Sequence, residues 1–392
     1  MEEKWSYFSL KPHLRNLRFG GYCALDPSTP PTRLYVHKMY MRFVLFSSIM
    51  FMTLHAMKCY EVRSDMNALM DTTFLLLTYL GSIYKQIVML VKADEVENLL
   101  NTMKGDLFNQ PEKEHHKLLK ETAREDRIIL FSYSFSGFAN AILMALYLVI
   151  LYATGKPVEF CIWFPFKPDT TLKFSFAVLY YYIQVTWIAV SMPTLDSLII
   201  CFLHQCSTQV NILRYDLENF VESCKIKSTN SKIPLMQAYD VKFKNMALHF
   251  IEIHKFFTKV EETYSRAILY QFLFGAWILC TTAYKLVEIN KTSIACLTTV
   301  LFLLAVFVEL FLFCFYGTRL TEASERLMDS AYFLDWVELP LKHRRNIFLF
   351  MEMIKKPMLP TAGFIAPLAN TTFVSIVKSS YSFYAFLKNT NN

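Results

Sequence analysis

Residues 361–392 end the chain and read TAGFIAPLANTTFVSIVKSSYSFYAFLKNTNN, and this stretch decides how the rest of the sequence is interpreted. Pro367 ends its first apolar piece, because the residue before a proline is pushed out of the helical region. The run 372–387 that follows is long enough to cross most of a bilayer. Its polar side chains gather on one face, at Ser375, Ser379, Ser382 and, past the run, Asn389.

Lys378 lies inside this run, and its charge would be energetically costly if this helix face were exposed to lipid. A helix face exposed to protein or water carries it at lower cost, so the stretch is apolar in composition but polar on one face. This pattern fits a pore-lining helix. It fits a plain seventh helix buried in a bundle equally well, because buried serines bond neighbouring backbone carbonyls.

Composition places the whole chain in a membrane. Its 392 residues are 54% hydrophobic and 16% aromatic, which is too apolar for an ordinary soluble domain. The net charge of +7 would suit a nucleic-acid partner, but the basic residues lie between apolar runs and form no patch. We therefore expect a membrane protein with no nucleic-acid partner. Residues 1–21 have no apolar core or cleavage site, so we expect no secretory signal peptide.

Seven apolar runs reach roughly the 20 residues that span a ~30 Å hydrocarbon core. They cover residues 39–57, 66–84, 128–153, 174–203, 267–284, 294–316 and 372–387. Pro193 is expected to bend or break the fourth run. Amphipathic helices are expected in the long connections 93–126 and 205–262. The predicted fold is all-α, with seven transmembrane helices and a split seventh helix.

The distribution of Lys and Arg predicts the orientation of these helices. Most of the 40 basic residues lie in the segments 1–42, 85–127, 214–266 and 319–356. The positive-inside rule places these segments and the N-terminus in the cytoplasm, so seven crossings place the C-terminus outside. Asn290 begins an Asn-Lys-Thr glycosylation sequon in a predicted outer loop, which agrees.

A G-protein-coupled receptor has its seven helices in the opposite orientation. The chain also has no Asp-Arg-Tyr at the end of the third run and no Asn-Pro-x-x-Tyr in the seventh. A transporter would be expected to show repeats with paired broken helices. Only the fourth and seventh runs are interrupted by proline here, and they do not correspond. Both classes are therefore disfavoured.

The region that begins at Cys314 resembles the C-terminal third of insect odorant receptors. The matching pieces are Cys314 with Gly317, Ser324, Ala331-Tyr332, Trp336, the helix 341–354, Lys356-Pro357, Ala362-Gly363, Phe373 and Lys378-x-Ser380-Tyr381-Ser382. The outer loop Cys161-x-Trp163-Phe164-Pro165-Phe166 is similar to the family as well. Gustatory receptors share the topology but usually carry Thr-Tyr followed by Gln-Phe near the end, so Ser380-Tyr381-Ser382 favours the olfactory branch.

The resemblance implies an odorant-gated, non-selective cation channel, assembled as a tetramer around a pore that the last helix lines. It implies four partners: a volatile odorant, a shared co-receptor subunit, membrane lipid and permeant cations. It also implies a place in the plasma membrane of an olfactory neuron dendrite. The co-receptor has a much longer loop between helices four and five than residues 205–262, so this chain resembles the odorant-tuning subunit. A gustatory-type channel and a metabotropic seven-helix receptor are the alternatives.

On this interpretation the chain divides into four parts. Residues 1–38 are a cytoplasmic N-terminal segment, and residues 39–316 hold helices one to six with the odorant pocket. Residues 317–360 form a cytoplasmic contact segment with the first part of helix seven. Residues 361–392 form the pore-lining helix and an extracellular C-terminus.

The resemblance places the odorant pocket in the outer half of the bundle, between helices two, three, four and six. A volatile ligand needs an apolar cavity with a few polar groups to orient it. Residues at near-helical spacing on one face of each helix are the candidates. They are Met70, Thr73, Phe74, Leu77, Asn140, Met144, Tyr147, Leu148, Phe176, Leu179, Tyr180, Ile183, Cys296, Thr299 and Val300.

The outer end of the last helix is the predicted gate. A narrow apolar ring stops conduction by dewetting, and Phe386 is placed to form one. Asn389 and Thr390 flank the ring outside, and Lys378 and Ser382 line the pore below it. The family typically has a smaller aliphatic side chain in place of Phe386, which leaves the register open by one residue. Glu309 and Lys378 are predicted at similar depth and could pair; the alternative is Lys378 alone in the inner vestibule.

Nothing in the sequence indicates an enzyme, a cofactor or a metal site. There is no Gly-rich phosphate loop and no nucleophile elbow. His115 and His116 are expected on a solvated helix face, because a metal site needs more ligands at fixed spacing. The nine cysteines contain no C-x-x-C pair. Cys59 and Cys161 both fall on the outer side and could form a bridge, although buried free thiols are commoner.

Overall fold

The computed structural model describes residues 4–26, 28–156, 158, 160–288 and 293–390, and these residues are almost wholly helical. The helices are α1 (Trp5–Phe8), α2 (Lys11–Phe19), α3 (Pro31–Glu61), α4 (Met66–Val91), α5 (Ala93–Lys104), α6 (Lys113–Ala153), α7 (Thr171–Glu218), α8 (Phe220–Ser231), α9 (Leu235–Glu288), α10 (Ile294–Tyr332), α11 (Leu341–Ile354) and α12 (Asn370–Thr390). Two short 3₁₀ helices cover Asp106–Phe108 and Trp336–Glu338, and two strands, β1 (Thr361–Ala362) and β2 (Ala366–Pro367), pair antiparallel.

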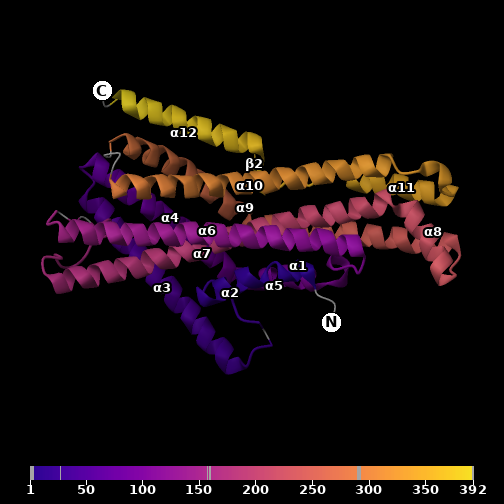
Figure 1. Cartoon of the computed structure of the whole chain (residues 1–392), viewed down its shortest axis with the longest axis horizontal. Helices are drawn as coiled ribbons and strands as arrows, with labels where there is room; N and C mark the ends of the chain where they lie inside the picture. Colours follow the sequence, from indigo (N-terminus) through magenta and orange to yellow (C-terminus); the bar gives the residue numbers. More distant parts are fainter. Residues whose placement is uncertain (1–3, 27, 157, 159, 289–292, 391–392) are drawn as a thin grey trace.

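The predicted membrane fold is confirmed. Among the described residues, α3, α4, α6, α7, α9 and α10 are long and apolar enough to cross a membrane. The seventh predicted run lies in α12, which has 21 residues. The β1–β2 hairpin separates α11 from α12, so the seventh helix is split (Figure 1). The long connections are helical as expected, because they hold α5, α8 and the extensions of α6, α7 and α9.

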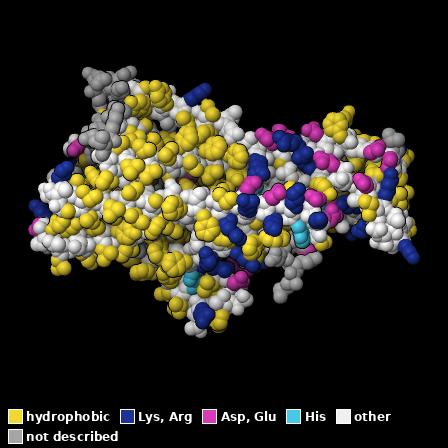
Figure 2. Space-filling view, in the orientation of Figure 1, with side chains coloured by type: hydrophobic (Ala, Val, Ile, Leu, Met, Phe, Trp, Pro, Cys, Tyr) yellow, Lys and Arg dark blue, Asp and Glu magenta, His cyan; other side chains and the backbone are white. Residues whose placement is uncertain are grey.

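Several helices are much longer than a bilayer is thick. α6, α7 and α9 have 41, 48 and 54 residues, so they run for roughly 60–80 Å against a ~30 Å hydrocarbon core. Figure 2 shows the result: one half of the visible surface is apolar, and the other half carries most of the charged side chains. The apolar half holds the junction of α6 and α7, and the charged half holds α8 and α11 (Figures 1 and 2). The positive-inside rule assigns the charged half to the cytoplasm.

α7 is the central helix of the molecule. It packs against α2, α6, α9 and α10, and every residue of the range 191–210 is buried. A helix that is covered on all sides has no polar face to present, so this stretch contains apolar residues together with small or hydrogen-bonded polar ones. α7 therefore fixes the positions of the helices around it.

Pro193 does not break α7, contrary to the stronger form of the prediction. The helix continues through Pro193 from Thr171 to Glu218. Because proline has no N–H, the carbonyl of Ala189 loses its usual helical donor. Gly137 of α6 lies directly against that carbonyl, where a Cβ would come within 2.3 Å of the oxygen. The two helices can approach this closely only because α6 has no side chain at this point.

The hairpin between α11 and α12 turns at residues 363–365, between the paired residues Ala362 and Ala366. Gly363 and Phe364 have φ values of +63° and +61°, and the N–H of Ile365 donates to the carbonyl of Ala362 at 3.2 Å. Two successive positive φ values are the signature of a type I′ turn. Gly317 lets α10 approach the end of this hairpin, because a Cβ there would lie 2.2 Å from the Leu368 oxygen. The start of α12 is thereby held against α10.

Candidate functional site

The apolar half contains a cavity of about 510 Å³, enclosed by α4, α6, α7, α9 and α10. This volume lies within the roughly 300–1,000 Å³ of small-molecule sites. The outer loop reaches the cavity through Phe160 and Cys161. That loop is tied to α3, because the Trp163 N–H donates to the Leu54 carbonyl at 3.2 Å. Helices thus form the sides of the cavity, and this loop contributes to its wall.

Eight of the fifteen predicted pocket residues line this cavity. They are Met70, Phe74 and Leu77 on α4, Asn140, Met144, Tyr147 and Leu148 on α6, and Thr299 on α10. The structure therefore places these predicted residues of α4 and α6 in the wall of one cavity. Whether these residues contact a ligand stays a prediction.

The other seven predicted residues lie elsewhere: Thr73, Phe176, Leu179, Tyr180, Ile183, Cys296 and Val300 are not in the cavity wall. The whole α7 set is on the wrong face, since Phe176 is 62% exposed and Leu179 is 58% exposed. The face of α7 that lines the cavity carries Tyr181, Val185, Ile188, Ala189, Met192 and Pro193. Lipid tails are as apolar as leucine, so large apolar side chains do not mark the inner face of a membrane helix.

α9 is a wall of the cavity that the sequence interpretation omitted. It contributes Gln271, Phe274, Ile278, Thr281, Thr282 and Lys285. Apart from the neighbours Thr281 and Thr282, these positions follow each other at three- and four-residue steps, which is the period of one helical face. The signal was therefore present in the sequence, but without a second marker it did not distinguish this face from ordinary packing.

Most polar groups in the cavity wall are already hydrogen-bonded within their own helices. The hydroxyls of Thr78, Thr281 and Thr299 donate to backbone carbonyls one turn earlier, at 2.7–3.0 Å. Three buried oxygens differ: Asn140 Oδ1, Thr282 Oγ1 and Glu309 Oε1 have no hydrogen-bond partner in the described part of the chain. Because all three residues line the cavity, these are the acceptors that it offers to a ligand.

Glu309 belongs to a buried ionic cluster and does not pair with Lys378. The ammonium of Lys85 donates to the carboxylate of Asp196 and, at 2.8 Å, to Gln271 Oε1. It also lies 3.7 Å from Glu309 Oε1. The predicted pair with Lys378 is therefore wrong, and Lys85, which was expected in a cytoplasmic segment, is buried. On α10, Phe307 and Phe311 face α12 through Phe373, so Glu309, halfway between them, points the other way.

α12 lies along the outside of the bundle, next to α9 and α10 (Figure 1). Its packed face includes Ser380, whose hydroxyl donates to the Ala276 carbonyl at 3.2 Å. Its polar residues Ser375, Lys378, Ser379 and Ser382 are all exposed on the face that the bundle leaves uncovered. The side chains of Phe386, Asn389 and Thr390 lie outside the described residues, so the predicted gate stays a prediction. Asn290, the predicted glycosylation site, also lies outside them.

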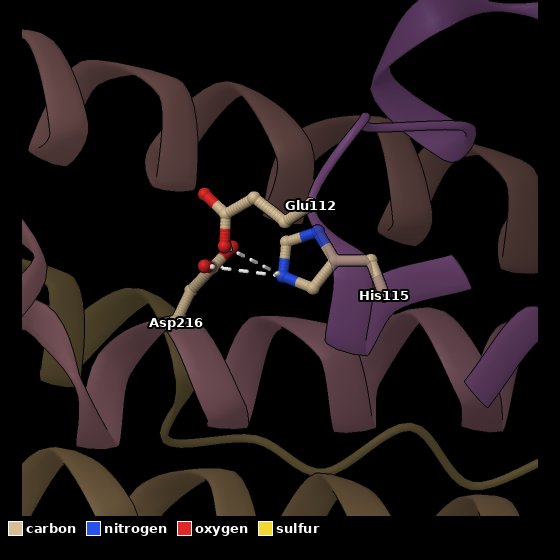
Figure 3. A group of neighbouring side chains, drawn as sticks. All are labelled: Glu112, His115 and Asp216. Carbon is tan, nitrogen blue, oxygen red and sulfur yellow. Dashed lines mark ion pairs between the residues drawn. The ribbon is translucent and has the colours of Figure 1, made fainter. Parts of the chain in front are cut away.

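A second cluster of chemical groups lies in the charged half, where α6 begins and α7 ends. His115 Nε2 is 3.4 Å from a Glu112 oxygen and 3.3 Å from an Asp216 oxygen (Figure 3). Three such groups could hold a metal ion. However, the ammonium of Lys242 already lies 2.7 Å from Asp216 and 3.4 Å from Glu112. The Lys242 ammonium therefore already pairs with both carboxylates, and the cluster is best described as an ion-pair network that joins α6, α7 and α9.

This network corrects one expectation and has a consequence for stability. His115 is buried, not on a solvated helix face. Asp216 lies near the end of α7, in the charged half and beyond the membrane-spanning length. Burial acts to raise the pKa of Asp216, but His115 and Lys242 outweigh it and hold that pKa below its usual value. The stabilisation is therefore present above the unfolded pKa of an aspartate and is lost as pH falls through the folded one.

Cys59 and Cys161 are both present as thiols in the structure, so no bridge joins them. Cys161 lines the cavity.

A protein-family model described as 7tm Odorant receptor matches residues 65–381 of the chain. Similar relatives from Drosophila melanogaster include odorant receptor 94a, 24% identical over 62% of this chain and 61% of the relative. Putative odorant receptor 92a is 23% identical over 59% of this chain and 54% of the relative. The match thus spans less than two thirds of either relative. Odorant receptor 10a is 23% identical over 97% of this chain and 95% of the relative.

The fold is similar to that of the insect olfactory receptor OR5 from Machilis hrabei. The TM-score is 0.82 at 15% sequence identity, over 96% of this chain and 97% of OR5. The structure of OR5 in complex with eugenol matches with a TM-score of 0.83 at 14% identity, over 97% of both chains.

Proposed function

Because the chain belongs to the 7tm odorant receptor family, we propose that it is the odorant-tuning subunit of an odorant-gated cation channel and not an enzyme. The observation that carries this proposal is the cavity of about 510 Å³ in the apolar half. It is concave, mainly apolar and equipped with a few polar groups, which is what a small volatile ligand needs. OR5, whose fold is similar, has a structure in complex with eugenol.

The cavity suits a small neutral ligand that is mainly apolar. Met144, Leu148 and Phe302 supply apolar surface, and Asn140 offers an amide oxygen without a hydrogen-bond partner in the described residues. A neutral molecule of modest size could bury its apolar body there and direct one polar group to Asn140. Each buried CH₂ of such a ligand contributes about 0.8 kcal/mol.

The exposed polar face of α12 supports the channel part of the proposal. Four polar side chains on the uncovered face of a membrane helix, one of them Lys378, would be costly against lipid. They are stable if α12 faces water, as it does when several subunits place this helix around a central pore. Four subunits, including a shared co-receptor, are the assembly we propose, with Phe386 as the outer constriction.

Each of the four parts of the chain has a role in this proposed function. Residues 39–316 would hold the ligand, residues 317–360 would contact neighbouring subunits, and residues 361–392 would form the pore. Residues 1–38 would remain on the cytoplasmic side. The proposed location is the plasma membrane of the olfactory neuron dendrite.

Expression in oocytes, alone and with a co-receptor, against a panel of volatiles tests the proposal. We expect cation current only with the co-receptor. Tyr147→Phe and Thr299→Val should change the rank order of effective volatiles, because both residues line the cavity. Leu179→Val is the matched control, since Leu179 is exposed on the outer surface of α7 and should leave the ranking unchanged.

Two results would contradict the proposal. A response to volatiles through second messengers with no conductance would favour a metabotropic receptor. Activation by soluble tastants and by no volatile would favour a gustatory-type channel.

A further inference from the structure

The inner end of the cavity carries the carboxyl group of Glu309 in a mainly apolar wall. Glu309 lines the cavity, and the residue is only 4% exposed. On α10 the cavity wall begins at Ala295 in the outer part of the helix and ends at Glu309. At 1.5 Å per residue these two positions are about 20 Å apart. A ligand with a head group at Glu309 would therefore have room for its body in the apolar part of the cavity.

The protein leaves this carboxylate partly unsatisfied. Lys85 directs hydrogen bonds to Asp196 and Gln271, and its distance of 3.7 Å from Glu309 Oε1 is too long for a hydrogen bond. Glu309 Oε1 accepts no hydrogen bond from any described residue. Buried polar atoms are nearly always hydrogen-bonded, so an exception inside a cavity needs an explanation.

The charges of the cluster point to the same explanation. One ammonium, on Lys85, faces two carboxyl groups, on Asp196 and Glu309. Asp196 takes the direct contact and does not line the cavity, whereas Glu309 does. Glu309 is thus the member of the cluster that has both spare acceptor capacity and access to a ligand.

We propose that Glu309 is a specificity-determining residue that accepts a hydrogen bond from an O–H or N–H group at one end of the ligand. The ligand class is a small, mainly apolar molecule with one terminal hydrogen-bond donor, such as an alcohol. Ethers and ketones of the same skeleton have no donor and leave this acceptor unsatisfied. This inference rests on the proposed function, because it names the ligand class of the same cavity.

The test compares an alcohol, its methyl ether and the corresponding amine on one carbon skeleton, for several skeletons, in cells that also express a co-receptor. A hydrogen bond accepted by Glu309 predicts that the alcohol is about 5-fold more potent than the ether. Glu309→Leu should bring the ratio of ether to alcohol half-maximal concentrations close to one. Glu309→Gln keeps a neutral acceptor and should give an intermediate ratio.

The variants are designed so that misfolding does not imitate the result. Glu309→Leu leaves Lys85 and Asp196 as a balanced ion pair, and the ether response reports whether the receptor is intact. Glu121→Gln is the control, because Glu121 is an exposed carboxylate in the charged half of α6; it should leave the ratio unchanged. If the leucine variant fails to reach the surface, the glutamine variant decides, because the ratio must fall in it too.

The outcomes separate this inference from the proposed function. If no volatile activates or binds to the wild-type receptor, the proposed function fails. If volatiles act but alcohol and ether are equally potent, or if the ratio survives in both Glu309 variants, Glu309 is not the anchor. An amine that is more potent than the alcohol and that loses this advantage in Glu309→Leu would support the inference with an ammonium as the donor.

Discussion

Lys85 illustrates how a single charged residue is stabilised inside the membrane-spanning part of this protein. Its side chain is 3% exposed and its ammonium contacts Asp196, Gln271 and, more distantly, Glu309. Removing one buried charge from such a cluster leaves its partners buried without a counter-charge. This costs more folding stability than the intact ion pair contributes.

The residue-scale prediction therefore concerns Lys85→Met. Two carboxyl groups would remain buried without a cation, so we expect a loss of about 3–5 kcal/mol in folding stability. The measurements are the fraction of receptor at the cell surface and the thermal unfolding midpoint in detergent. Lys117→Met is the control, because Lys117 is exposed and its contact with Glu114 is 4.0 Å long. Adding Asp196→Asn to Lys85→Met should recover part of the loss, and wild-type behaviour of Lys85→Met alone would refute the account.

At the scale of helices, the sequence predicted which segments are helical better than it predicted which face of each helix points into the bundle. All seven apolar runs are helical, because crossing lipid requires a long apolar segment whose backbone bonds internally. The face of α7 was misassigned because Phe176 and Leu179 are stable against lipid, and hydrophobicity alone does not tell lipid from protein. Lys85 and Asp196 are far apart in sequence, so no local pattern predicted that they meet.

α12 differs, because its two faces are chemically unlike and the sequence shows this directly. Cysteines placed at Ser375, Ser379 and Ser382 lie on the exposed face, whereas Ile376 and Ser380 lie toward the bundle. If the exposed face lines a pore, a water-soluble thiol reagent should modify the first three and change the current. Cysteines at Ile376 and Ser380 are the matched controls and should react slowly. Similar rates on both faces, or fast reaction without any change in conductance, would exclude a pore-lining role for α12.

At the scale of the molecule, the division into an apolar and a charged half constrains how apolar surface can be covered (Figure 2). In the apolar half, exposed side chains such as Phe176 face lipid. In the charged half no lipid is available, yet α11 leaves Phe348, Leu349 and Met353 exposed. A contiguous apolar face in water is usually a binding surface for another protein chain.

We predict that this α11 face contacts neighbouring subunits, since it projects from the half that lipid does not cover. Burying each such side chain contributes about 1.5–3 kcal/mol, so Phe348→Ser combined with Leu349→Ser should reduce assembly strongly. The inner face of α11, with Ile347 and Phe350, is untouched, so the single subunit should keep its fold.

Co-purification with the co-receptor measures assembly, and the thermal midpoint measures folding. Ile226→Ser on α8 is the control, because Ile226 is also exposed in the charged half but belongs to another helix. Full assembly of the double variant at an unchanged midpoint would show that the face has another partner.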